Sequence, residues 1–311
     1  MLNESERLAL LQVPSGIVDV VIDSDTFNEI DDQFAISLAL LSPERMRVKA
    51  IYAAPFHNRK SSGPADGMEM SYQEILRLLR LIGRYPPVYR GSESYLADEK
   101  TPVLSDAASD LARRAMEYTP ERPLYVVGLA AITNIASALL LNPGIADRIV
   151  CVWLGGHAPT WPDTDEFNLR QDVAAARVVF SSGAPLVLVP CKGAVTTFLT
   201  TGPELRAWLW GRNALCDDLV SATERTAEAY AKGHVWSRVL WDVTAVAWLL
   251  NDDHRFMLDR LVPTPIPEYD HHWGRDDTRP LCRMVTFVNR DPLMEELFGK
   301  LAAAKDARAA P

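Results

Sequence analysis

The sequence has few cysteines and no long apolar run, and each absence excludes a class of protein. Its 4 cysteines, Cys151, Cys191, Cys216 and Cys282, lie far apart and form no paired motif. A disulfide framework or a zinc site is therefore not expected, and free thiols favour a reducing, cytoplasmic location. No apolar run approaches the roughly 20 residues that cross a membrane. We therefore expect no membrane partner.

The sequence also lacks an excess of basic residues. Its 32 Lys and Arg residues are outnumbered by 41 Asp and Glu residues, which gives a net charge of −9. Nucleic-acid binding needs basic clusters that neutralise phosphates, so we expect no nucleic-acid partner. Residues 1–6 lack the basic-then-apolar order of a signal peptide. These absences leave a small molecule as the expected partner.

Strand-like and helix-like segments alternate along most of the 311 residues, of which 48% are hydrophobic. Near-continuous apolar strands separated by helices predict an α/β fold with a mostly parallel sheet flanked by helices. We expect one domain over residues 1–311, a mostly helical part from Pro203 onward, and a frayed tail over 302–311. The expected strands are 17–22, 47–53, 123–127, 148–154, 185–189 and 283–288. The expected helices are 32–41, 70–81, 105–117, 134–141 and 172–181.

The most informative segment is 20–32, in which an apolar strand ends in Asp23 and Asp25 and a helix begins at Asp31 and Asp32. Ligands bind beyond the carboxyl ends of the strands in such sheets. Carboxylates that converge there repel one another and raise each other's pKa unless a cation neutralises them. Hard oxygen ligands suit Ca²⁺ or Mg²⁺ better than zinc. The segment therefore predicts a metal site.

Two other interpretations of this segment are open. Asp31 and Asp32 could simply favour the helix N-terminus through its dipole, with Asp25 or Asn28 as the cap. This accounts for two acids but leaves Asp23 and Asp25, at the end of a buried strand, unexplained. The second is a phosphatase of the haloacid dehalogenase type that uses Mg²⁺, in which Asp23 would be the nucleophile and Asp25 the general acid. That motif is short and needs support from the rest of the chain.

Several further segments, in order along most of the chain, resemble the inosine–uridine-preferring nucleoside hydrolase family. In that family the acidic motif usually reads Asp-x-Asp-Pro-Gly-x-Asp-Asp. Residues 26–30 of this sequence replace Pro-Gly-x, so the motif here is two residues longer. Glu166-Phe167-Asn168 is similar to the Glu-Phe-Asn that follows Met-Gly-Gly in that family. The segments that carry the resemblance are 23–32, 53–58, 128–134, 153–156 with 166–168, and 241–245.

The resemblance implies a Rossmann-like nucleoside hydrolase fold and metal-dependent hydrolysis of the N-glycosidic bond of a ribonucleoside or related riboside. One Ca²⁺ would be held by Asp25, Asp32, Asp242 and the backbone carbonyl of Thr133. The metal would also bind the ribose 2′- and 3′-hydroxyls and a water whose pKa it lowers. Asp25 would be the catalytic base. The ribose contacts would come from Asp31, Asn58, Glu166 and Asn168.

The chain departs from the family where the leaving group is expected. The histidine that usually precedes the last aspartate is Trp241, which can stack on a base but cannot protonate it. The asparagine expected between Gly156 and Glu166 is absent. His157, Tyr230 and His234 are candidates to replace these groups.

The departure at Trp241 leaves room for a non-catalytic ribose-binding or nucleoside-binding relative. The complete set of acidic residues argues for an enzyme, because a site without turnover has no need of mutually repelling carboxylates. The resemblance also implies a homodimer or homotetramer.

Overall fold

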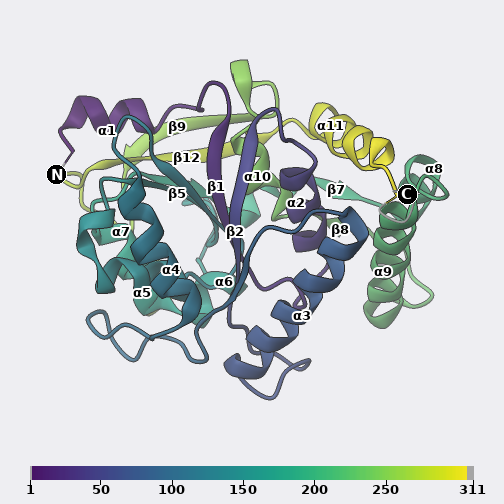
Figure 1. Ribbon diagram of the computed structural model, residues 1–311, viewed down its shortest axis with the longest axis horizontal. Coiled ribbons are helices and arrows are strands. Elements are labelled where there is room, and N and C mark those ends of the chain that lie inside the picture. Colours follow the sequence, from purple (N-terminus) through teal and green to yellow (C-terminus); the bar gives the residue numbers. More distant parts are fainter. Residues whose placement is uncertain (1, 307–311) are drawn as a thin grey trace.

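The computed structural model describes residues 2–306 and centres on one large sheet. The strand order is β3-β2-β1-β4-β5-β6-β12-β9 (Figure 1). Neighbouring strands are parallel as far as β12, and β9 is antiparallel to β12. The strands are β1 (Val18–Ser24), β2 (Met46–Ala53), β3 (Val88–Arg90), β4 (Leu124–Gly128), β5 (Ile149–Leu154), β6 (Leu186–Val189), β9 (Met257–Pro263) and β12 (Leu281–Val288).

Helices cover both faces of this sheet, and a separate hydrophobic cluster fills each side (Figure 1). Along β5, Val150 and Val152 point into one cluster, while Cys151 and Trp153 point into the other. This alternation explains why the strand is apolar throughout, since neither of its faces meets water. The mostly parallel sheet and its flanking helices confirm the predicted fold class.

The first face is covered by two helices from the N-terminal half, α2 (Asp31–Leu40) and α3 (Pro64–Ile82), and by the helices of the C-terminal part. The latter are α9 (Ala214–Ala231), α10 (Val243–Trp248) and α11 (Arg290–Ala303), with α8 (Gly202–Trp208) against α9. The second face is covered by α4 (Asp106–Arg114), α5 (Thr133–Leu141) and α7 (Val173–Ser181). The short helices α1 (Glu4–Leu10) and α6 (Phe167–Gln171) complete the set.

Two strands of the sheet, β3 and β9, were not predicted from the sequence. In β9, most residues are exposed or half-buried, so the segment lacks the apolar character of the inner strands. Pairing with β12 holds it in place, and its Asp259 accepts bonds from Arg283 at 2.5 Å and from Trp248 at 3.1 Å. The predicted helical C-terminal part is present as α8 to α11, and β9 lies within it.

The small strand pairs β7 (Leu199–Thr200) with β8 (Arg238–Val239), and β10 (Ile266–Pro267) with β11 (Trp273–Gly274), lie outside the main sheet. The tail predicted to fray begins inside α11, and Asp306 accepts a hydrogen bond from the Ala214 backbone at 2.8 Å. The rest of that tail, 307–311, lies outside the described residues. Within residues 2–306, no helix is both long and apolar enough to span a membrane.

Candidate active site

A cavity of about 340 Å³ lies at the carboxyl ends of the central parallel strands. It is bordered by residues that directly follow β1, β4, β5 and β6, as expected for this class of sheet. Its lining residues include most of those singled out from the sequence. They are Asp25, Asn28, Glu29, Asp31, Asp32, Asn58, Leu129, Leu154, His157, Asp165, Glu166, Phe167, Asn168, Arg170, Cys191, Lys192, Trp241 and Asp242.

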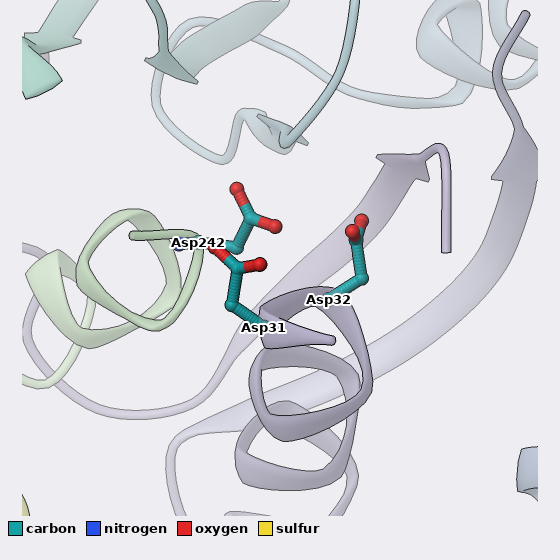
Figure 2. A group of neighbouring side chains, drawn as sticks. All are labelled: Asp31, Asp32 and Asp242. Carbon is teal, nitrogen blue, oxygen red and sulfur yellow. Dashed lines mark hydrogen bonds between the residues drawn. The ribbon is translucent and has the colours of Figure 1, made fainter. Parts of the chain in front are cut away.

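Acidic side chains from two helices converge in this cavity. Asp31 and Asp32 open α2, and Asp242 directly precedes α10 (Figure 2). Carboxylate oxygens of these residues all lie within 4.8 Å of one another, and all of them are buried. Asp25, from the end of β1, lines the same cavity but falls outside this closest group.

The lengthened turn between β1 and α2 keeps the acidic residues together. The Asn28 amide donates to the Asp25 carbonyl at 2.7 Å, which closes a turn over the extra residues. The Ser24 hydroxyl donates to Asp32 at 2.6 Å, and the Asp242 amide lies 3.4 Å from an Asp31 oxygen. The added residues are thus absorbed by the turn, and Asp31 remains at the site.

Burial and mutual repulsion shift the proton affinity of these acids. Burial, followed by repulsion from Asp32 and Asp31, raises the pKa of Asp25 well above its ordinary range. Burial, with repulsion from Asp31, raises the pKa of Asp32 to about 7. Burial, followed by repulsion from Asp31, Asp32 and Asp25, raises the pKa of Asp242 well above its ordinary range. Such a cluster favours a bound cation, because a cation removes the repulsion that each ionised oxygen otherwise feels.

Arg238 of β8 provides a positive charge at the edge of this cluster. Its guanidinium lies 3.2 Å from Asp31 and also pairs with Glu29. Arg238 was not singled out from the sequence as a site residue. No local pattern could reveal the pair, because Arg238 is 207 residues from Asp31 in the chain.

Glu166 and Asn168 are held rigidly beside the acids at the start of α6. The Glu166 carboxylate caps this helix by accepting the amides of Asn168, Leu169 and Gly156 at 2.9–3.0 Å. The Asn168 side-chain amide donates to the carbonyls of Leu129 and Leu154, at 3.0 and 3.2 Å. Its Oδ1 accepts no hydrogen bond within residues 2–306 and is free for a ligand.

Thr133, whose backbone carbonyl is predicted to bind the metal, lies in the segment after β4. Thr133 is the first residue of α5, and its hydroxyl donates to Asp172 at 2.7 Å. It is not among the residues that line the cavity, whereas Leu129 is. The Thr133 carbonyl as a metal ligand stays a prediction, and Leu129 is the residue directly after β4 that lines the cavity.

Asn58 and Trp241 also reach the cavity, as predicted. The Asn58 side chain donates to Asn28 Oδ1 at 2.7 Å and accepts the Lys60 amide at 2.8 Å. Trp241 is half-buried and directly precedes Asp242, so its ring borders the acidic cluster.

A family model described as the inosine-uridine preferring nucleoside hydrolase matches residues 20–292, which cover all of these site residues. The chain belongs to this nucleoside hydrolase family. The match confirms the resemblance inferred from the motifs.

Curated relatives and solved structures agree with this membership. The pyrimidine-specific ribonucleoside hydrolase RihA of Citrobacter koseri is 32% identical over 183 residues, which are 51% of this chain and 55% of that protein. The chain thus spans about half the length of the curated relatives it matches. The purine-preferring ribonucleoside hydrolase from Gardnerella vaginalis has a TM-score of 0.74 at 21% identity, covering 94% of this chain and 100% of its own. A plant nucleoside hydrolase, the PpNRh1 enzyme, has a TM-score of 0.73 at 22% identity, covering 92% and 99%. These structures show a shared fold.

The phosphatase interpretation does not fit this nucleoside hydrolase family member. Its required nucleophile, Asp23, is fully buried at the end of β1 and does not line the cavity. One of its oxygens accepts from Asn134 at 2.7 Å, and burial raises the pKa of this carboxyl to about 7. Asp23 therefore fastens β1 to α5 inside the protein.

The three candidates for leaving-group contact lie in different places. His157 is buried, lines the cavity, and accepts the Lys192 amide at its Nδ1 at 3.3 Å. Tyr230 borders a neighbouring cavity, and His234 is exposed and lines neither one. Lys192 itself was missed, although its position just after β6 follows the rule that ligands bind beyond strand ends.

Proposed function

We propose that this chain hydrolyses the N-glycosidic bond of a ribonucleoside or related riboside and releases ribose and the base. The observation that carries the proposal is the buried acidic cluster of Asp25, Asp31, Asp32 and Asp242, which shares one cavity with Asn168 and Glu166. This arrangement suits a substrate whose ribose hydroxyls are bound in place while water attacks the N-glycosidic bond. Membership in the family supports the same reaction.

The acidic residues fit a hard divalent cation, and we propose Ca²⁺. The close carboxylates of Asp32 and Asp242, with the carboxylate of Asp25 in the same cavity, form an all-oxygen donor set. The backbone carbonyl of Thr133 is the proposed further ligand, from the segment whose Leu129 lines the cavity. When bound, the cation supplies the positive charge that acidifies a water and attracts ribose hydroxyls.

Asp25 is the proposed general base. Its Oδ2 is buried and has no hydrogen-bond partner within residues 2–306, so it can accept a proton from the attacking water. The water oxygen bonds to C1′ of the ribose as the bond from C1′ to the base nitrogen breaks.

The ribose is held by groups that are already fixed in place. Asn168 offers its free Oδ1, and Asn58 and Glu166 present further polar atoms whose positions are set by hydrogen bonds to the backbone. Asp31 accepts from a ribose hydroxyl while Arg238 balances its charge. Fixing these groups in advance reduces the ordering required when substrate binds.

Trp241 and His157 make the leaving-group side unusual. Trp241 stacks on the departing base and donates no proton to it. Burial, with the nearby Lys192, lowers the pKa of His157, so the imidazole is neutral at pH 7. With Nδ1 accepting from Lys192, the proton sits on Nε2, which is a hydrogen-bond donor rather than a strong acid. We propose a leaving group that departs with little help from an acid.

The proposed partner is the small nucleoside or riboside alone, in the cytoplasm, where the buried and unpaired cysteines remain reduced. We also propose a homodimer or homotetramer, and light scattering of the purified chain tests it. A monomer at micromolar concentration would contradict the oligomeric proposal and leave the catalytic one intact.

The deciding experiment measures reducing-sugar release from purine and pyrimidine ribonucleosides after chelation, with and without added Ca²⁺. Calcium-dependent release from any of them supports the proposed reaction. Calorimetry of the calcium-loaded protein distinguishes a hydrolase from the non-catalytic ribose-binding or nucleoside-binding relative suggested by Trp241. Binding of a nucleoside with no release of sugar or base would favour a ribose-binding relative.

A further inference from the structure

A second cavity, of about 670 Å³, lies beside the acidic one, between α3, α9 and the turn after β1. The two cavities share Asn28, Glu29 and Asn58 as lining residues, so one ligand can extend from one into the other. The charged residues that line the second cavity are mostly basic. They are Arg59, Lys60, Arg77, Arg225 and Arg238, against Glu29, Glu74 and Asp218.

Two arginines form ion pairs with the three acidic side chains in this lining. Arg77 forms bonds to Glu74 at 2.7 Å and to Asp218 at 2.8 Å. Arg238 pairs with Glu29. With five basic and three acidic side chains, the lining of the second cavity as a whole carries an excess of two positive charges.

The remaining basic residues have no acidic partner. Within residues 2–306, Arg59, Lys60 and Arg225 form no ion pair, and Lys60 Nζ donates only to the Asn28 carbonyl, at 2.6 Å. Like charges around one concave surface repel one another and attract an anion. The pair of cavities is thus strongly polarised, with carboxylates at one end and unpaired cations at the other.

We propose that the substrate carries an anionic group beyond the ribose, a phosphate or a carboxylate, which Arg59, Lys60 and Arg225 bind. This inference rests on the proposed function, since the ribose must lie at the acidic cluster. The chemistry is unchanged: water adds at C1′, the base leaves with the bonding electrons and takes up a proton, and the anionic group stays intact. Its source is a phosphate on the ribose or a carboxylate on the base.

The test compares uridine with uridine 5′-monophosphate and orotidine on the calcium-loaded protein. We expect kcat/KM and calorimetric affinity for one anionic compound to exceed those for uridine by about tenfold at low salt. This advantage shrinks as ionic strength rises, because exposed charges are screened. Preference for the monophosphate assigns the charge to the ribose side, and preference for orotidine assigns it to the base.

Charge reversal identifies the residues responsible. In the double variant Arg59→Glu and Arg225→Glu, both changes are at exposed positions, so the fold is retained. The ratio of kcat/KM for the preferred anion over uridine should fall to about one or below. The matched control is Arg80→Glu, an exposed arginine of α3 that lines neither cavity, and it should keep the wild-type ratio.

Failure of this inference differs from failure of the proposed function. Equal use of uridine and both anions, or an unchanged ratio in the double variant, would overturn the inference while the hydrolase assignment stands. Absence of turnover with any riboside, with calcium bound, would overturn the hydrolase assignment. The calorimetric ratio would then still decide whether the second cavity prefers an anion.

Discussion

At the scale of single residues, the charge on Asp25 has opposite effects on catalysis and stability. Its buried and unpartnered Oδ2 suits a base, yet the ionised carboxylate faces Asp31 and Asp32. We predict that Asp25→Asn lowers kcat/KM by about 10²–10⁴, the usual contribution of a general base. In the absence of calcium, its free energy of unfolding at pH 7.5 should match or exceed that of the wild type, since one repelling charge is removed.

Rate measurements and urea denaturation check this pair of outcomes. The control is Glu295→Gln, an exposed acid of α11, which should leave both quantities unchanged. Full activity of Asp25→Asn with calcium bound would contradict the assignment of Asp25 as base.

Trp241 gives a second test at the residue scale. Restoring the family's usual histidine, in Trp241→His, supplies an acid where the indole has none. We predict a gain of at least about tenfold in kcat for ribosides whose base must be protonated as it leaves. Hydrolysis of 4-nitrophenyl riboside, whose leaving group needs no proton, should change little.

Trp241→Phe is the matched control, because it keeps an apolar ring without an acidic proton. It should show no gain with either type of substrate. If Trp241→His raised kcat equally for both leaving groups, the effect would come from removing the large indole ring. That outcome would contradict a role of residue 241 in leaving-group chemistry.

At the scale of elements, Asp172 connects the helices behind the site. Its carboxylate caps α7 through the Ala175 amide at 2.9 Å, and it also accepts the Leu96 amide at 2.9 Å and the Thr133 hydroxyl at 2.7 Å. We predict that Asp172→Ala lowers the free energy of unfolding by about 2–3 kcal/mol, because a cap is lost and buried donors lose their acceptor.

Urea denaturation measures this loss. Ser105→Ala is the comparison, since its hydroxyl caps α4 with one bond, to Ala108 at 3.1 Å, and should cost about 1 kcal/mol. Equal losses for the two variants would mean that the links from Asp172 to α5 and to the loop after β3 contribute nothing.

At the scale of the whole molecule, the acidic cluster couples stability to pH and to calcium. The pKa of Asp23 and that of Asp32 are both raised to about 7, from 3.8, first by burial. Between pH 3.8 and about pH 7, these two carboxyls keep their protons in the native state but have released them in the unfolded state. Their stabilising contribution is therefore full below about pH 4 and is lost as pH rises through about 7.

We therefore predict that, in chelator, the free energy of unfolding falls more steeply between pH 5 and 7.5 in the wild type than in Asp32→Asn. Calcium binds the ionised carboxylates, so it should raise Tm more at pH 7.5 than at pH 5.5. Calcium at about 100 times its Kd adds about 2.7 kcal/mol. Thermal unfolding at both pH values checks this, and an equal calcium effect at both would contradict a carboxylate site.

The sequence by itself determined the order of the inner strands along the chain, the acidic segment and the family. These follow from local rules: strands buried on both faces must be apolar throughout, as in β5, and acids at the junction of a strand and a helix stand out in sequence. Local patterning found Asp25, Asp31 and Asp32. The resemblance to the family implied the other site residues that line the same cavity, which are Asn58, Glu166, Asn168, Trp241 and Asp242.

Only the tertiary structure decided which atoms of these segments face one another. The motif pointed to Thr133, whereas Leu129 is the residue directly after β4 that lines the cavity. Arg238 meets Asp31 across 207 residues, and Arg59 and Arg225 meet at one cavity from separate segments. Edge strand β9 forms because β12 offers it a partner. Long-range contacts of this kind leave no period or spacing in the sequence, because they depend on how the finished layers pack.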